Sequence, residues 1–306
     1  MAQVELLDRD AAERDALHPL GALDLARRLP GLIVSAKEVA ATVMHGMHGR
    51  RRAGIGETFW QFRPFTFGEA SARIDWRRSA RDDRLYVRER EWEAAHTVWI
   101  WADRSPSMAY VSSLALQPKI DRALVLALAL ADCLVRGGER VGITGLTRAF
   151  ATRDIIERLA ERMAQEAARE DYVAAELPPA DALAPRTQAV IISDFLSDPE
   201  EIAATIRGMA SRGARGHLVM ITDPVEETFP FRGHTEFCDV DTPARLRVGE
   251  AQSFRVAYMQ RLVEHRERLR AAAGSRGWTF ALHRTDRPAS EALLALRMQL
   301  EAGQGG

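Results

Sequence analysis

Three apolar segments, each followed by an aspartate, constrain the fold of this chain more than any other feature. They lie at residues 97–103, 188–194 and 217–223, and segments with helical periodicity separate them. Continuous apolar strands alternating with helices are typical of a parallel sheet that is covered on both faces. The sequence therefore predicts an α/β fold with a doubly wound, mostly parallel sheet and helices on both faces.

The other expected elements follow from periodicity and from turn residues. Helices are predicted at residues 117–136, 154–169, 199–209, 251–273 and 288–301, and shorter strands at 85–87, 140–146, 148–151, 235–240, 245–248 and 278–283. Between Asp24 and Val43 the apolar spacing is helical, but Pro30 and Gly31 interrupt it, which favours two short helices. We expect a domain boundary near residue 95, with an N-terminal extension at 1–95 and the α/β domain at 96–306.

The extension combines helical, aromatic and arginine-rich parts. Residues 57–67 carry five aromatic side chains, which must dock onto other parts of the protein. Seven arginines face four acidic residues between Arg73 and Arg90. A solvated face with ion pairs is the commoner explanation for such a run. A basic nucleic-acid contact formed by the segment Arg50 to Arg90 stays open as an alternative.

Composition excludes several classes of protein. The 42 basic and 43 acidic residues give a net charge of −1, so nothing global favours nucleic acid or an anionic membrane as a partner. The longest apolar run, residues 123–131, is far too short to cross a bilayer, and residues 1–10 do not resemble a secretory signal. Cys133 and Cys238 are far apart and lack metal-ligand spacing, as expected in a reducing compartment. We expect a soluble, cytoplasmic protein.

The loop after the first strand carries the clearest chemistry. Asp103, Ser105 and Ser107 alternate along it, so their side chains can converge on one point, and Pro106 favours an extended Ser105. Hydroxyl and carboxylate oxygens suit a hard cation, above all Mg²⁺. The motif predicts a metal site at the carboxyl edge of the sheet.

Two further aspartates end at the same edge. Asp194 and Asp223 follow the second and third apolar strands, and ligands of doubly wound sheets bind beyond the carboxyl ends of the strands. A metal-dependent hydrolase using Asp103, Asp194 and Asp223 is therefore an alternative function. A serine nucleophile is not favoured, because neither serine lies in a Gly-x-Ser-x-Gly setting.

These residues resemble known families. The loop Asp103-x-Ser105-x-Ser107, with Asp194 after a later strand, looks like the metal-ion-dependent adhesion site of von Willebrand factor A (vWA) domains. Upstream, the segments 63–69, 73–81 and 85–89 are similar to the signature of the bacterial DUF58 family, in particular Ile-Asp-Trp at 74–76 and Ser-Ala-Arg at 79–81.

The match has two departures from these families. Phe67 and the pair Glu69-Ala70 weaken the acidic turn of the signature. The threonine that usually completes an adhesion site is missing, because residues 177–183 contain no hydroxyl. The candidate metal ligands are thus Asp103, Ser105, Ser107 and Asp194, with Asp181 as a substitute for the threonine and Asp223 as a further carboxylate.

The resemblance implies a binding protein rather than an enzyme. DUF58 proteins typically accompany MoxR-type AAA+ ATPases, and the pair is thought to act in chaperone-like maturation or metal insertion. The expected function is therefore a vWA-type protein-interaction module, Mg²⁺-dependent through a degenerate adhesion-type site, that acts as an adaptor for such an ATPase.

Overall fold

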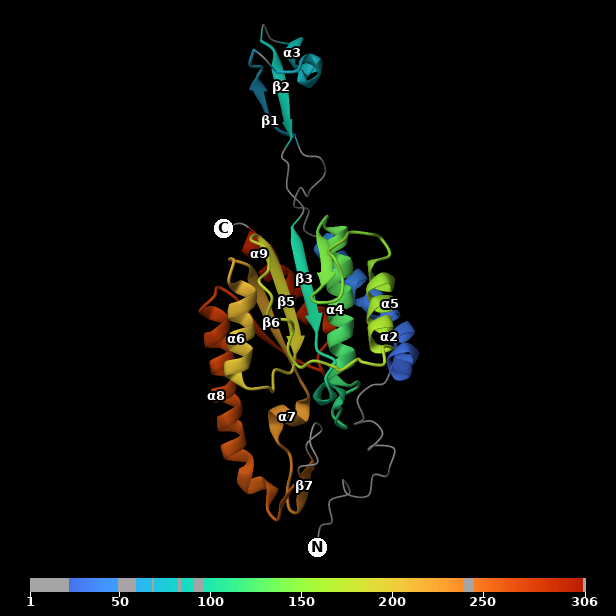
Figure 1. Ribbon diagram of the computed structural model, residues 1–306, viewed down its shortest axis with the longest axis vertical. Helices are drawn as coiled ribbons and strands as arrows, with labels where there is room; N and C mark the ends of the chain where they lie inside the picture. Colours follow the sequence, from blue (N-terminus) through green and yellow to red (C-terminus); the bar gives the residue numbers. More distant parts are fainter. Residues whose placement is uncertain are drawn as a thin grey trace. The chain divides into compact units, whose positions relative to one another are not determined.

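A five-stranded parallel sheet forms the centre of the larger unit of the protein (Figure 1). The computed structural model describes residues 22–48, 59–67, 69–81, 84–90, 96–238 and 245–304. The strands are β3 (Thr97–Ala102), β4 (Arg140–Ile143), β5 (Thr187–Ser193), β6 (Arg215–Thr222) and β9 (Thr279–Arg284). They lie in the order β4-β3-β5-β6-β9, and every neighbouring pair is parallel. This confirms the predicted fold class.

Helices cover both faces of this sheet because its central strands are apolar on both sides. Helix α4 (Lys119–Arg136) packs along β3, β4, β5 and β6, and α5 (Ile155–Ala167) and α9 (Ala289–Gln304) lie against α4. The other face packs on α6 (Pro199–Ala210) and α8 (Arg255–Gly274), as Figure 1 shows. There Ile191 and Leu218 share a core with Ile206 and Leu269.

The N-terminal helix corrects one prediction. Residues Ala22–His48 form a single helix, α2, with Pro30 inside it, whereas the Pro30-Gly31 pair predicted two helices. Proline removes one hydrogen bond of the helix ladder. The buried stripe continues past it through Leu25, Leu29, Leu32, Ala36, Ala40 and Val43. Burial of this stripe on both sides of Pro30 outweighs the local disruption.

Several helices and strands begin or end at other residues than predicted. The strand expected at 148–151 is reduced to one bridge between Phe150 and Val141, and the helix expected from residue 251 starts with a 3₁₀ turn, η4 (Ala251–Phe254). Strands β7 (Thr235–Cys238) and β8 (Arg245–Val248) form an antiparallel pair. Residues 239 and 240, at the end of the predicted strand 235–240, lie outside the described residues. Short helices η3 (Pro106–Ala109) and α7 (Pro224–Thr228) follow β3 and β6.

The domain division differs from the expected boundary at residue 95. Helix α2 groups with the sheet unit, and residues 47–95 form a second, smaller unit. Within the larger unit Arg28 of α2 pairs with Asp121 of α4. The buried stripe of α2 therefore belongs to the core of the larger unit. The charged sequence that follows α2 gave no indication of this.

The smaller unit explains the Ile-Asp-Trp and Ser-Ala-Arg motifs. It contains the antiparallel strands β1 (Phe59–Pro64) and β2 (Tyr86–Arg90), the turn η2 (Ser71–Arg73) and the short helix α3 (Trp76–Ser79). Asp75 caps α3 by accepting a hydrogen bond from the Arg78 backbone at 2.9 Å. The buried Ser79 hydroxyl accepts one from the Tyr86 backbone at 2.9 Å. These motif residues hold the helix against the strand.

Some arginines of this unit have partners within it. Arg63 forms a two-pronged ion pair with Glu69, with nitrogen–oxygen distances of 2.6 and 3.1 Å. The Arg78 guanidinium lies 4.6 Å from the centre of the Tyr86 ring. Arg50, Arg51 and Arg52, which belong to the basic segment of the nucleic-acid alternative, lie outside the described residues. Within the part of the chain that the structure describes, no helix is long and apolar enough to cross a membrane.

Candidate functional site

Asp103 and Asp194 lie at the topological switch point of the sheet. Counted along the chain, the five strands are arranged in the order 2-1-3-4-5, so the connection reverses direction between β3 and β5. Ligands of such sheets bind beyond the strand ends at this point. The Asp103 backbone donates a hydrogen bond to the Ile192 carbonyl at 2.8 Å, and the Ser193 hydroxyl donates one to Asp103 Oδ2 at 2.6 Å. The two strand ends are therefore tied together directly.

The Asp-x-Ser-x-Ser loop converges as its spacing predicts. Asp103 Oδ1 accepts a hydrogen bond from the Ser105 backbone at 2.8 Å, and the Ser105 and Ser107 hydroxyls lie 3.2 Å apart. Ser105 is extended, and Pro106 after it opens η3. Asp103 and Ser105 are both buried. The loop thus gathers three polar side chains where the sequence placed them.

Asp103 sits in an unfavourable place for a charge. Burial, and then the neighbouring charge of Asp194, raise the pKa of Asp103 to about 7. The hydrogen bonds from Ser193 and Ser105 act in the opposite direction and stabilise the carboxylate.

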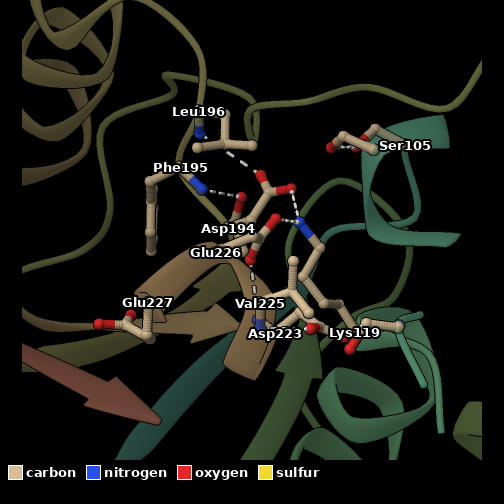
Figure 2. A network of polar contacts seen from close by, with 12 residues as sticks. Ser105, Lys119, Asp194, Phe195, Leu196, Asp223, Val225, Glu226 and Glu227 are labelled. Carbon is tan, nitrogen blue, oxygen red and sulfur yellow. Dashed lines mark hydrogen bonds and ion pairs between the residues drawn. The ribbon is translucent and has the colours of Figure 1, made fainter. Parts of the chain in front are cut away.

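Asp194 meets a lysine at this edge. Lys119, the first residue of α4, places its ammonium 2.8 Å from Asp194 Oδ2 and 2.7 Å from Glu226 Oε1. Figure 2 shows the ammonium between the two carboxylates, with Ser105 set apart from this network. Burial alone would lower the pKa of Lys119, but the charges of Asp194 and Glu226 outweigh it and raise that pKa above its usual range. Three elements, α4, the end of β5 and α7, thus meet around one cation.

Asp223 is the N-cap of α7. Its Oδ1 accepts a hydrogen bond from the Val225 backbone at 2.8 Å, and its Oδ2 accepts one from the Ser112 backbone at 2.9 Å. Glu226 completes a capping box by accepting from the Asp223 backbone at 2.8 Å. Both carboxylate oxygens of Asp223 therefore accept hydrogen bonds from backbone N–H groups.

Asp181 is exposed in the segment between α5 and β5. Leu183, two residues later, donates a backbone hydrogen bond to Met209 near the end of α6, and the neighbouring Ala180 packs on Gly208. This segment is therefore held against the end of α6. The structure thus brings Asp103, Ser105, Ser107 and Asp194 to the switch point, whereas Asp181 is an exposed residue of the segment that packs on α6.

The side chains at the switch point do not fit the Mg²⁺ that an adhesion-type site implies. An ammonium already lies against Asp194, and no hydroxyl stands in for the missing threonine in the segment around Asp181. Mg²⁺ demands near-octahedral oxygen coordination at short distances, which an adjacent ammonium opposes by charge. Among the described residues, no group of three or more His, Cys, Asp or Glu side chains is placed to hold a metal ion.

An aromatic cavity opens beside this network. Its volume is about 400 Å³, and six aromatic rings contribute to its walls. Tyr110 follows β3, and Glu226 and Phe229 belong to or follow α7, so the cavity lies at the same carboxyl edge of the sheet. The remaining lining residues are Val225, Phe231, Phe237, Leu246, Val248, Phe254, Ala257, Tyr258 and Arg261. We call this the aromatic cavity.

Sequence reasoning missed Lys119, Glu226 and the aromatic cavity. A lysine at the start of an apolar helix looks like an ordinary exposed residue, and burial is invisible in the sequence. One signal was available: the chain contains only two lysines, Lys37 and Lys119, against forty arginines. The capping pattern Asp223-Pro-Val-Glu226 also indicated that Asp223 begins a helix.

The fold and the switch-point residues define a doubly wound α/β domain with an adhesion-like loop. The chain belongs to the DUF58 family, described as a protein of unknown function, whose model matches residues 61–268. A comparison with curated proteins gave no match.

Three solved structures are similar to this chain. An aerotolerance-related membrane protein from Bacteroides fragilis is 16% identical, with a TM-score of 0.40, over 68% of this chain and 100% of its own. BatB from Bacteroides thetaiotaomicron is 13% identical, with a TM-score of 0.37, over 68% and 100%. The SpRpn10 VWA domain is 12% identical, with a TM-score of 0.32, over 70% and 99%. At these TM-scores the similarities do not inform on function.

Proposed function

We propose that this protein is a protein-interaction module that binds its partner at the carboxyl edge of the sheet. The observation that carries the proposal is the aromatic cavity, which is open to solvent at the edge where ligands of doubly wound sheets bind. A concave, mostly apolar surface with a few polar groups is typical of a recognition site. The partner inserts an apolar side chain into it.

Binding suits this edge better than catalysis. The polar groups at the switch point engage one another: Asp103 with Ser105 and Ser193, and Asp194 with Lys119. Asp223, which the hydrolase alternative needs, caps α7 with both oxygens. The open surface beside them is lined mainly by carbon atoms, which favour contact with another protein.

The partner we propose is a MoxR-type AAA+ ATPase, with the chain acting as its adaptor in chaperone-like maturation of client proteins in the cytoplasm. Membership of the DUF58 family supports this partner, because the resemblance of the sequence to that family implies it. The free thiols of Cys133 and Cys238 agree with a reducing compartment. The partner contacts the aromatic cavity directly.

The test replaces an exposed side chain of the cavity wall. Leu246 lines the cavity and is 57% exposed, so Leu246→Asp places a charge in the surface that the partner buries without disturbing the core. We expect binding to a purified MoxR-type ATPase to weaken at least about tenfold, as for a buried apolar contact of a binding hot spot. Isothermal titration calorimetry measures the change.

Val263→Asp is the matched control. Val263 is 54% exposed on α8 and does not line the cavity, so this variant adds the same charge to a similar surface. Equal affinities of the wild type and both variants for the ATPase would show that the interface does not include the cavity. If the wild type bound no MoxR-type ATPase, the proposed partner would be wrong.

A further inference from the structure

Lys119 stands out because lysine is so rare in this chain. Of the two lysines, the Lys37 side chain is 52% exposed and pairs with Glu157 at the surface, whereas that of Lys119 is 1% exposed. A buried ammonium is strongly disfavoured unless it is paired and hydrogen-bonded. Every other basic side chain apart from the histidines is an arginine. Lys119 is therefore the buried one of two lysines in a chain that otherwise uses arginine as its cation.

Lys119 is held by carboxylates that come from two different elements. Two carboxylates from different elements, Asp194 and Glu226, approach the nitrogen within 2.8 Å, and the Tyr110 ring lies 5.8 Å away, measured to its centre. An ammonium is a small point charge with three donors that can turn toward separate oxygens. A planar guanidinium needs more space and a fixed geometry.

We propose that the Lys119 ammonium supplies to Asp194 the positive charge that a divalent cation supplies in an adhesion-type site, so that this edge of the sheet is assembled without metal. Of the candidate metal ligands, it is Asp194 that the ammonium contacts, and its second carboxylate partner is Glu226. The cation is covalently part of α4 and is present at all times. The missing threonine is consistent with this replacement, because a site whose charge is balanced by lysine does not need the threonine hydroxyl as a ligand.

The replacement has a structural consequence for the aromatic cavity. Glu226 and Tyr110 both contact Lys119 and both line the cavity. The ammonium therefore fixes part of the cavity wall by linking α4, the β5 end and α7. A metal ion at an exposed rim binds the partner directly. Lys119 is buried, so it acts by positioning the wall of the aromatic cavity.

The first test uses the chemistry of amines on the folded wild-type protein. Reductive methylation followed by peptide mass spectrometry reads out both lysines separately. We expect Lys37 to be methylated and Lys119 to react more than about tenfold more slowly, because its reaction requires local unfolding. Methylation at similar rates would show that Lys119 does not hold this buried position, and the proposal would fail.

The second test adds metal to the wild type. We expect the same melting temperature in EDTA and in millimolar Mg²⁺, and no enhancement of water-proton relaxation when the protein is added to Mn²⁺. A saturable rise in melting temperature with Mg²⁺ that Asp103→Asn removes would establish a metal site beside Lys119 and overturn the replacement. Both tests use the chain without its partner, so their failure leaves the proposed function standing.

A variant pair extends the second test. Lys119→Met keeps an unbranched side chain but leaves Asp194 and Glu226 without their cation, so we expect a lower melting temperature that Mn²⁺ or Mg²⁺ partly restores. Lys37→Met, which removes an exposed ion pair, is the control and should melt as the wild type does. Wild-type stability of Lys119→Met would contradict the role of the ammonium. If Lys119→Met does not fold, the methylation and metal arms on the wild type still decide.

Discussion

Asp223 and Asp198 perform the same local task in different surroundings. Each is the N-cap of a helix and accepts a hydrogen bond from the backbone two residues later, but Asp223 is buried and Asp198 is exposed. Asp223 also accepts a hydrogen bond from Ser112, so it joins the loop after β3 to α7. Its contribution to stability should therefore exceed that of an ordinary cap.

We expect Asp223→Ala to lower the free energy of unfolding by about 2–4 kcal/mol, because one buried and one partly buried backbone N–H group lose their acceptor. Asp198→Ala should lower it by about 1 kcal/mol, since water can replace the carboxylate there. Urea denaturation of both variants measures the difference. Equal losses would mean that the bond to Ser112 contributes nothing.

At the scale of single residues, the sequence predicted positions better than roles. Asp103, Ser105 and Ser107 converge because the alternation of an extended loop dictates it. Asp223 follows its strand as predicted, yet its oxygens face backbone groups that only the folded chain brings near. The partner of Asp194, Lys119, is 75 residues away in sequence, so no local pattern could reveal the pair.

At the scale of elements, apolar periodicity was the most reliable signal. The apolar segment predicted at 97–103 corresponds to β3 (Thr97–Ala102) and the aspartate that follows it, because a run of apolar residues between polar ones has few alternatives. Helix α2 was misjudged for the opposite reason: Pro30 and Gly31 are strong local signals, and the burial of the stripe on either side is a tertiary effect. The aromatic cavity is assembled from five separate elements, so no single segment predicts it.

Pro30 gives a direct test of the continuous helix. The residue is exposed and lies inside α2, where alanine is the better helix former. We expect Pro30→Ala to raise the free energy of unfolding by about 1–2 kcal/mol, a value reduced by the greater freedom of the unfolded alanine chain. Chemical denaturation measures the gain.

Gly31→Ala is the companion variant. A Cβ at Gly31 meets no atom within 4 Å, so this change should add about 0.5–1 kcal/mol by the same helical preference. Two helices separated at this point would make both variants neutral or destabilising, and that result would contradict the single helix.

At the scale of the whole sheet unit, one buried histidine couples folding to pH. His217 of β6 lies within hydrogen-bonding distance of Thr279 in β9, at 2.8 Å, and of Gln188 in β5, at 3.3 Å. Burial lowers the pKa of His217 to about 4, whereas the unfolded chain has a histidine pKa of about 6.5. The unfolded state therefore binds the proton first as the pH falls. The contribution of His217 to stability is complete above about pH 6.5 and is lost progressively toward pH 4.

The expected result is a difference between wild type and His217→Gln. Between pH 7 and pH 5 the wild type should lose about 2 kcal/mol more than this variant, because the contributions of all other titrating groups cancel in the comparison. Urea denaturation at both pH values measures it. Leu218→Val, a neighbouring core change without an ionisable group, should keep the wild-type dependence and so separates titration from simple loss of stability. If the free energy of unfolding of His217→Gln depended on pH as that of the wild type does, the folded protein would accommodate the charged imidazolium. The three strands around His217 would then have to open locally to water.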